Sequence, residues 1–200
     1  MRRGRRGPTI ATPIPSFGDT TMMDRREFLL SGAGAATALL LPISGASADL
    51  VNDRALAIHN LNTDESAMIA YVRRGRYIRD GLRRLSVIMR DWRTNEIIPV
   101  DLRLLDVLYV LQIMSGTREP IRLTSGYRSA ASNRLLARTD PDVAQNSFHI
   151  KGQAADIRIP GVSLATLRDH AVSLRSGGVG YYPSSGFVHV DVGPSRVWTK

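Results

Sequence analysis

Residues 147–159 read SFHIKGQAADIRI, in which a histidine-containing loop is followed by a glycine and then by a short apolar strand. Gly152 lets the chain fold back at the start of this strand, because glycine accepts backbone conformations that other residues avoid. His149 and Asp156 lie seven positions apart across this glycine. The fold-back can therefore bring an imidazole and a carboxylate to one point.

A second histidine stands on a later strand. His189 lies in the run 187–192, and a neighbouring strand can bring it to the same point as His149 and Asp156. Two imidazoles and one carboxylate, with a fourth position open to water, are the ligand set of a catalytic zinc, whereas structural zinc sites are closed by four protein ligands. Such a zinc lowers the pKa of its water to about 7 and polarises a carbonyl, as amide hydrolysis requires. A strand histidine is more often an ordinary half-buried side chain, so the spacing alone leaves both interpretations open.

The composition narrows the chemistry further. The chain has 200 residues, 43% hydrophobic and 22% charged, which suits one globular domain and excludes two large ones. It contains no cysteine, and this excludes disulfide scaffolds, cysteine-ligated zinc, iron–sulfur clusters and thiol nucleophiles. Any metal must bind to His, Asp or Glu. Of the other two histidines, we expect His59 on a surface strand and His170 on a solvated helix face.

The amino-terminal part of the chain has the pattern of an export signal. It contains Arg25-Arg26, then a small and apolar run, and then Ala46-Ser47-Ala48. This order predicts a twin-arginine signal peptide over 22–48, cleaved after its last alanine, with a retained membrane anchor as the alternative. Residues 1–21 are basic and patternless, and we expect a disordered or untranslated extension. Residues 49–200 would then form the mature domain, in the periplasm or cell envelope, after export by the twin-arginine route.

The charge of the chain suggests a partner in the cell envelope. The formal charge is +9, and it is +6 on residues 49–200, because the first 48 residues hold six arginines and three acidic residues. Outside the cytoplasm the abundant polyanions are cell-wall glycopeptide and lipid headgroups. No helix-turn-helix spacing and no basic patch interleaved with aromatic residues supports DNA binding. We therefore predict no nucleic-acid partner, no stable membrane span after signal cleavage, and a monomer.

Hydrophobic periodicity predicts the secondary structure of the domain. Helices are expected over 78–92, 101–114, 130–138 and 163–174. Strands are expected over 56–60, 67–72, 121–124, 154–159, 179–182 and 187–192, with the first two and the last two forming hairpins. Because strands come first and are later mixed with helices, we predict a single α+β domain with a mainly antiparallel sheet flanked by helices.

The residues around the proposed ligands match a known pattern. Their order, Ser-x-His-x-x-Gly-x-Ala-x-Asp followed by His-x-Asp, resembles the signature of the LAS zinc metallopeptidases, the group of lysostaphin, the D-Ala-D-Ala metallopeptidases and the hedgehog fold. The segments LTSGYRS (123–129), GGVGYYPSS (177–185) and FVHVDVGP (187–194) resemble the small exported murein endopeptidases of the murein endopeptidase K type. The resemblance covers essentially all of 49–200. It implies a hedgehog-like or D-Ala-D-Ala-peptidase-like fold and hydrolysis of peptide cross-links between peptidoglycan stems.

The resemblance also implies the metal ligands and raises a question about the base. His149, Asp156 and His189 would bind one Zn²⁺ ion. Many relatives carry Glu, Asp or His shortly before the last ligand as a general base, but the position three before it is Gly186 here. Asp191 is the nearest carboxylate, and it either acts as the base or orients His189 from the same strand face. The missing acid leaves a second function open, a non-catalytic, metal-containing module that binds the cell wall.

Three further residues receive roles from the resemblance. Arg128 would face the site and hold a substrate carboxylate or a polarised carbonyl, for which a guanidinium is suited, or it is a surface arginine at a helix start. Ser147 would position the substrate or brace the loop that carries His149. Tyr127 would line the cleft and contact substrate, or it packs in the core.

Overall fold

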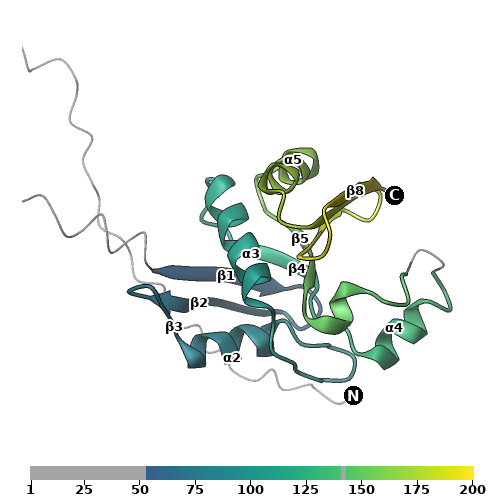
Figure 1. The fold of residues 1–200 in the computed structure, drawn as a ribbon, viewed down its shortest axis with the longest axis horizontal. Helices are drawn as coiled ribbons and strands as arrows, with labels where there is room; N and C mark the ends of the chain where they lie inside the picture. The colour runs from purple at the N-terminus through teal and green to yellow at the C-terminus, as the bar shows by residue number, and fades with distance from the viewer. Residues whose placement is uncertain (1–52, 141–142) are drawn as a thin grey trace, which may run out of the picture. The chain divides into compact units, whose positions relative to one another are not determined.

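The computed structural model describes residues 53–140 and 143–200, which form an eight-stranded sheet with helices packed around it (Figure 1). The strands are β1 (Arg54–Asn60), β2 (Glu65–Arg73), β3 (Arg76–Tyr77), β4 (Ile121–Ser125), β5 (Ala154–Arg158), β6 (Gly178–Tyr182), β7 (Phe187–Asp191) and β8 (Arg196–Thr199). The helices are α2 (Arg79–Ile88), α3 (Leu102–Met114), α4 (Ala130–Leu136), α5 (Leu164–Leu174) and a short 3-10 helix, η1 (Phe148–Lys151). The predicted extension over 1–21 and the predicted signal over 22–48 lie outside the described residues.

The sheet has the order β3-β2-β1-β4-β5-β7-β6-β8. Neighbouring strands are antiparallel except for two parallel pairs, β1 with β4 and β6 with β8. The predicted α+β domain with a mainly antiparallel sheet is therefore confirmed, and so are the two predicted hairpins, β1 with β2 and β6 with β7. β3, β8 and η1 were not predicted from the sequence.

Polar caps explain where the two longest helices begin. At the start of α3, the side chain of Asp101 accepts a hydrogen bond from the backbone N–H two residues later. At the start of α5, the side chain of Ser163 accepts one from the backbone N–H three residues later. α5 ends at Leu174, as predicted. Arg175 adopts a left-handed conformation with φ of 50°, so the helix stops before Gly177-Gly178, and β6 already begins at the second of these glycines.

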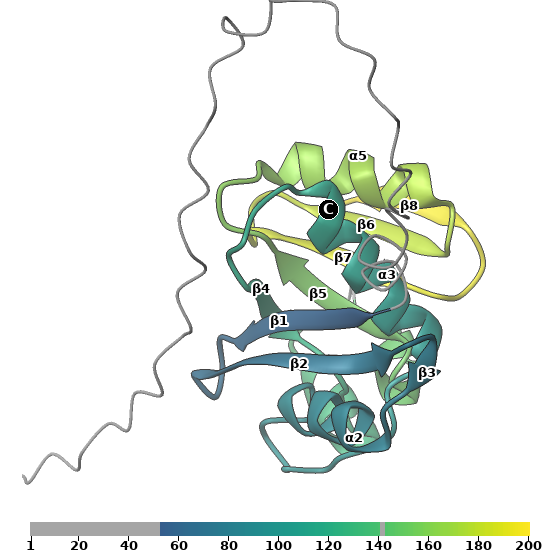
Figure 2. The same cartoon turned by 90° about the vertical axis from the view of Figure 1, so that its left-hand side faces the viewer.

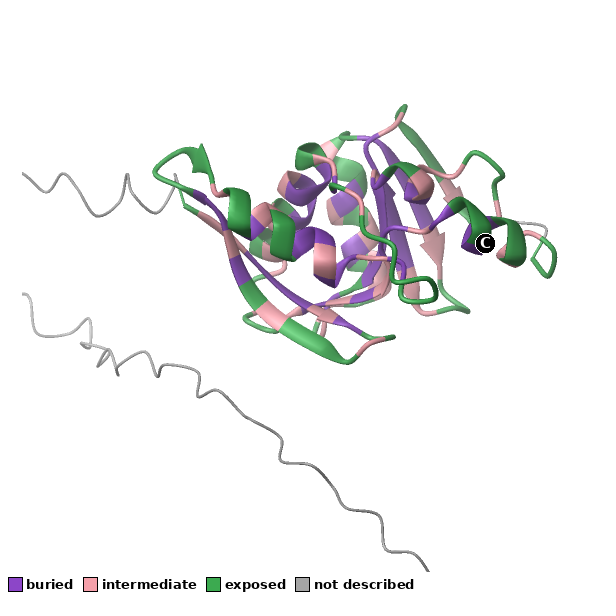
Figure 3. Ribbon diagram, turned by 90° about the horizontal axis from the view of Figure 1, so that it is seen from below, coloured by how far each residue is buried: buried purple, intermediate pink, exposed green. Residues whose placement is uncertain are grey.

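The hydrophobic core lies between the sheet and the helices. α3 packs against β1 and α5, α5 packs against β6 and β7, and α2 packs against β2. Figure 2 shows α5 lying along the part of the sheet that contains β6 and β8. Buried residues follow the central strands and the helix faces turned toward them (Figure 3). This packing fixes the positions of strands β5 to β8, and two of the predicted metal ligands, Asp156 and His189, lie on β5 and β7.

A buried carboxylate links the end of α2 to the start of α4. α2 ends at Ile88 instead of the predicted residue 92, because the chain turns back and the Asn95 N–H donates to the Asp91 carbonyl at 2.7 Å. The Asp91 side chain accepts the backbone N–H of Ser129, the residue that caps α4, at 2.8 Å. Burial alone would raise the pKa of Asp91, but hydrogen bonds, including those from the Ser132 side chain and the Ser129 backbone, lower it to about 2.

We predict that Asp91→Asn lowers the free energy of unfolding by about 2 kcal/mol near neutral pH, because the folded protein stabilises this charge relative to an unfolded pKa of about 3.9. The stabilisation is complete above about pH 4 and is lost as the pH falls through about 2, since the folded pKa is the lower one. Urea unfolding of both proteins at several pH values measures this, with the exposed Asp80→Asn as the control. A difference that does not shrink with acid would contradict the assignment.

Candidate metal centre

Two of the predicted ligands face each other across neighbouring strands. β5 and β7 are antiparallel, and their register pairs Asp156 directly with His189. Paired residues on antiparallel strands have side chains within contact distance on the same face of the sheet. The Asp156 Oδ1 lies 2.8 Å from the His189 Nδ1 as a result.

The third ligand comes from η1, which precedes β5. The Ser147 hydroxyl caps this short helix by accepting the backbone N–H of His149 at 3.3 Å. Gly152 ends it with φ of 64°, a left-handed conformation that glycine adopts without strain, and the chain then enters β5. The fold-back predicted at this glycine is therefore present, and it turns the His149 ring toward the strands.

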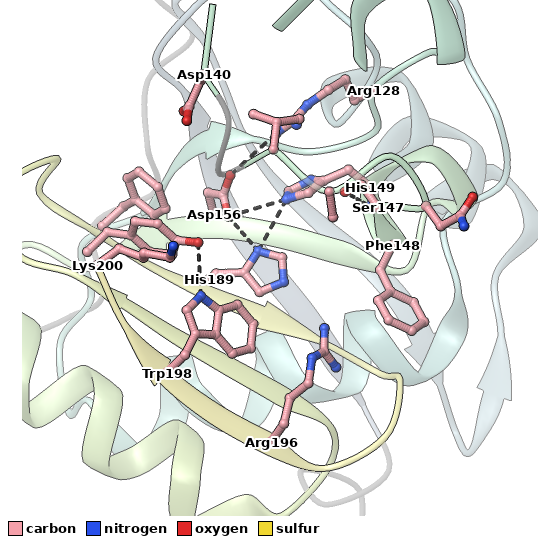
Figure 4. A pocket seen from close by; sticks show the side chains of 15 residues that line it. Arg128, Asp140, Ser147, Phe148, His149, Asp156, His189, Arg196, Trp198 and Lys200 are labelled. Atoms are coloured by element: carbon pink, nitrogen blue, oxygen red, sulfur yellow. Dashed lines mark hydrogen bonds and ion pairs between the residues drawn. The ribbon is translucent and has the colours of Figure 1, made fainter. Parts of the chain in front are cut away.

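Three donor atoms converge between η1, β5 and β7 (Figure 4). The His149 Nε2 lies 3.3 Å from the His189 Nδ1 and 3.3 Å from the Asp156 Oδ1. Two ligands of a tetrahedral zinc, each about 2.0–2.1 Å from the ion, lie about 3.3 Å apart. The spacing of these atoms fits a zinc ion, and His149, Asp156 and His189 are all buried.

Hydrogen bonds on the far side of each ring set the tautomers that metal binding needs. The His149 Nδ1 lies 2.7 Å from the carbonyl oxygen of Gly126, and the His189 Nε2 lies 3.0 Å from Asp191 Oδ2. In the neutral imidazole, each of these nitrogens carries the hydrogen that it donates to an oxygen, which leaves a lone pair on the other ring nitrogen. Two lone pairs and a carboxylate oxygen then meet at one point, where a positive charge, either a metal ion or a proton, offsets their repulsion. This donor set fits a metal site.

Asp191 is placed to orient His189. Its side chain is fully buried, and it accepts hydrogen bonds from the backbone N–H groups of Gly178 and Gly193 at 3.1 and 2.8 Å and from the Arg196 guanidinium at 2.7 Å. Burial would raise the pKa of Asp191, but these donors and His189 lower it. Of the two roles considered for this residue, the geometry favours orientation over general base, because both carboxylate oxygens are occupied and Asp191 does not line the pocket.

A pocket of about 350 Å³ opens beside the three donor atoms. Its lining includes Arg128 and Ser147, two of the residues predicted to meet substrate. The Arg128 guanidinium donates to Asn133 and Ser125 at 3.2 and 3.4 Å and lies 3.9 Å from Asp156 Oδ2, so it is not a surface arginine. Its buried Nε has no hydrogen-bond partner within the described part of the chain. Arg128 thus offers an unpaired donor close to the proposed metal ligands.

Tyr127 does not line this pocket. Its side chain is buried and its backbone N–H donates to the Met89 carbonyl at 2.7 Å, while burial and the nearby Glu96 and Asp91 raise the pKa of its phenol. Of the two interpretations of Tyr127, packing next to the α2 end fits the geometry. Ser147 lines the pocket and braces η1, and this position fits both of its proposed roles.

β8 and the residue after it supply pocket residues that were not predicted from the sequence. Arg196 and Trp198 of β8 and the following Lys200 occupy alternate positions and all line the pocket, as do Asp140 of the polar loop and Tyr182 of β6. These three residues alternate along the chain, as residues on one face of a strand do. The strand is short, however, and it follows a proline and a serine, so no hydrophobic run indicated it in the sequence.

The two remaining histidines lie away from the centre. His59 of β1 is partly exposed and pairs with Asp64 at 2.9 Å, as expected for a surface strand. His170 of α5 differs from its prediction, because it is half-buried and its Nδ1 is buried without a hydrogen-bond partner among residues 53–140 and 143–200.

The family described as Peptidoglycan L,D-endopeptidase MepK matches residues 48–198. The chain belongs to this family. The MepK of Escherichia coli K12 and that of Shigella flexneri are each 43% identical to it over 176 residues, 88% of this chain and 97% of theirs. The probable MepK of Haemophilus influenzae is 40% identical over 177 residues, covering 88% of this chain and 95% of the relative. The resemblance to the murein endopeptidase K type within the LAS metallopeptidases is thereby confirmed.

Proposed function

We propose that this protein is a zinc-dependent endopeptidase that hydrolyses peptide cross-links of peptidoglycan. The observation that carries the proposal is the convergence of the His149 Nε2, the His189 Nδ1 and the Asp156 Oδ1 beside an open pocket, in a chain of the MepK family. The relative at 43% identity is named as a peptidoglycan L,D-endopeptidase, and the one at 40% as a probable peptidoglycan L,D-endopeptidase. The three donors leave room for a fourth ligand, which is typical of catalytic and not of structural zinc.

The protein supplies different groups to the reaction. A zinc ion held by the three donors would polarise a carbonyl oxygen and lower the pKa of a water molecule. The guanidinium of Arg128 would hold a substrate oxygen, either of the scissile carbonyl or of a stem carboxylate, because this cationic donor lines the pocket beside the three donor atoms. Ser147 keeps the His149 loop in place, and Asp191 keeps the His189 ring in the metal-binding tautomer.

Gly186 stands where many relatives carry the general base, and it has no side chain that could accept a proton. Another residue must therefore accept the proton of the attacking water. Asp140 and Asp156 are the acidic residues in the pocket lining, and Asp156 is occupied by the two histidines. We therefore infer that Asp140, from the loop after α4, takes the proton of the water that attacks the peptide carbonyl. The C–N bond then breaks, and the departing amine accepts the proton that Asp140 took from the water. This assignment replaces Asp191 as the candidate base.

We also propose export to the periplasm or cell envelope. The support is the twin-arginine pattern and the small-residue cleavage site before residue 49, next to the point at residue 48 where the family match begins. Within residues 53–140 and 143–200, no helix has the length and apolar character needed to cross a bilayer. The basic charge of the domain suits a substrate that carries carboxylates.

We predict that the purified protein releases new peptides from isolated peptidoglycan sacculi, that a chelator abolishes the release, and that added zinc restores it. Mass spectrometry of the soluble products measures the reaction and identifies the bond that is cut. A protein that holds one zinc per chain, binds sacculi and leaves every cross-link intact would instead be the non-catalytic wall-binding module.

A further inference from the structure

Three neighbouring strands place a histidine, a glycine and a tryptophan side by side. Gly180 of β6 pairs with His189 of β7 on one side and with Trp198 of β8 on the other. A Cβ atom at Gly180 would lie only 2.6 Å from the indole of Trp198, so the indole occupies the space that a side chain would fill. Its ring centroid is 5.3 Å from that of His189. Trp198 therefore packs directly on a proposed metal ligand.

The same indole holds a tyrosine at the pocket. The Trp198 Nε1–H donates to the Tyr182 hydroxyl oxygen at 2.9 Å. The Tyr182 ring also stacks on Phe187, with centroids 4.6 Å apart and an interplanar angle of 21°. Tyr182, Phe187 and Trp198 all line the pocket that contains the three donor atoms. The hydroxyl is thus fixed by two aromatic neighbours and faces the space where a substrate would bind.

The hydrogen bond from the indole decides what the hydroxyl can do. A phenol has one proton and two lone pairs, and the indole, which can only donate, occupies one lone pair. The phenolic proton is therefore left to be donated, and a hydroxyl that already accepts a hydrogen bond is the stronger donor. Figure 4 shows Trp198 beside His189 at one wall of the pocket and Arg128 at another.

We propose that Tyr182 is a catalytic residue that donates a hydrogen bond to the carbonyl oxygen under attack, and that Trp198 is a positioning residue that acts through it. This inference rests on the proposed function. The oxygen gains negative charge as the tetrahedral intermediate forms, so a donor fixed beforehand stabilises the transition state more than the bound substrate. No bond at Tyr182 forms or breaks, and its proton stays on the phenol.

The test compares initial rates on cross-linked muropeptides, which give kcat and KM separately, together with zinc content and thermal unfolding. Tyr182→Phe keeps the ring stack and removes the hydroxyl, and we expect kcat to fall about 10²-fold with KM and zinc content unchanged. Trp198→Phe keeps an aromatic ring but removes the indole N–H, and we expect kcat to fall roughly three- to tenfold. Trp198→Phe in the Tyr182→Phe background should then cost nothing more.

Tyr181→Phe is the matched control. Tyr181 is the next residue on β6, it points to the opposite face of the sheet, and its ring lies 4.9 Å from Arg168 of α5. We expect this variant to keep its kcat. A Tyr182→Phe protein with kcat within about twofold of the parent, with only KM raised, or with zinc or stability lost in parallel would overturn the inference. A parent protein that cleaves no muropeptide would instead contradict the proposed function itself.

Discussion

Replacement of His149 by alanine is expected to remove the bound zinc and to reduce peptidoglycan hydrolysis by at least about 10³-fold. The remaining donors, His189 and Asp156, would form an incomplete site, because a catalytic zinc in a protein needs three ligands. Elemental analysis of the purified variant measures the first effect, and peptide release from sacculi measures the second. Circular dichroism checks that the sheet is intact.

Two further variants make this result interpretable. His59→Ala removes a histidine of β1 that pairs with Asp64 and does not line the pocket, and it should keep both zinc and activity. His149→Gln fills more of the space that alanine would leave and tests the ligand if the smaller substitution unfolds the protein. One zinc per chain together with unchanged hydrolysis in a folded His149 variant would remove the proposed centre.

The proposed metal ligands could be predicted from the sequence because part of their geometry is local and because a motif surrounds them. His149 and Asp156 are separated by one short turn at Gly152, where the glycine indicates that the chain reverses. His189 is 33 positions from Asp156 in the chain, so its place beside that residue follows from the strand register and not from local geometry. It could be predicted from the alternation along its strand and from the resemblance of the surrounding motif to that of the LAS metallopeptidases.

The walls of the pocket could not be predicted in the same way, since no motif marks them and their positions depend on strand pairing alone. β8 joins the sheet parallel to β6, and that pairing is what brings Trp198 over Gly180. The role of Asp191 likewise depends on a contact with Arg196, five residues ahead, and on the N–H of Gly178 from another strand. Hydrophobic patterns give no signal for a polar side chain whose partners are fixed only by strand order.

The early end of α2 has a similar cause. Periodicity continues to Trp92, so the sequence predicts a longer helix, but the chain turns at Asp91, whose carboxylate is needed to hold Ser129 at the start of α4. This tertiary contact outweighs the local helical preference. It also holds the segment from which Arg128 enters the pocket, so the shorter helix serves the site.

The two carboxylates that could serve as the base should respond in opposite ways to neutralisation. Asp191→Asn is expected to weaken zinc binding about 10- to 100-fold, because the partner that fixes the His189 tautomer loses its charge. Excess zinc should then restore most of the peptidase activity, since a positioning residue acts only through the metal ligand. Zinc titration in the presence of a competing chelator, followed by rates at saturating zinc, measures both.

Asp140→Asn should leave zinc binding unchanged and lower kcat by about 10²- to 10⁴-fold, with no recovery at saturating zinc, because it removes a proton acceptor from the pocket and leaves the three donors intact. The opposite pattern is just as informative. If Asp191→Asn kept its zinc and still lost kcat at saturating metal, Asp191 would be the base. The buried hydrogen bonds to Gly178, Gly193 and Arg196 would then have to open during the reaction.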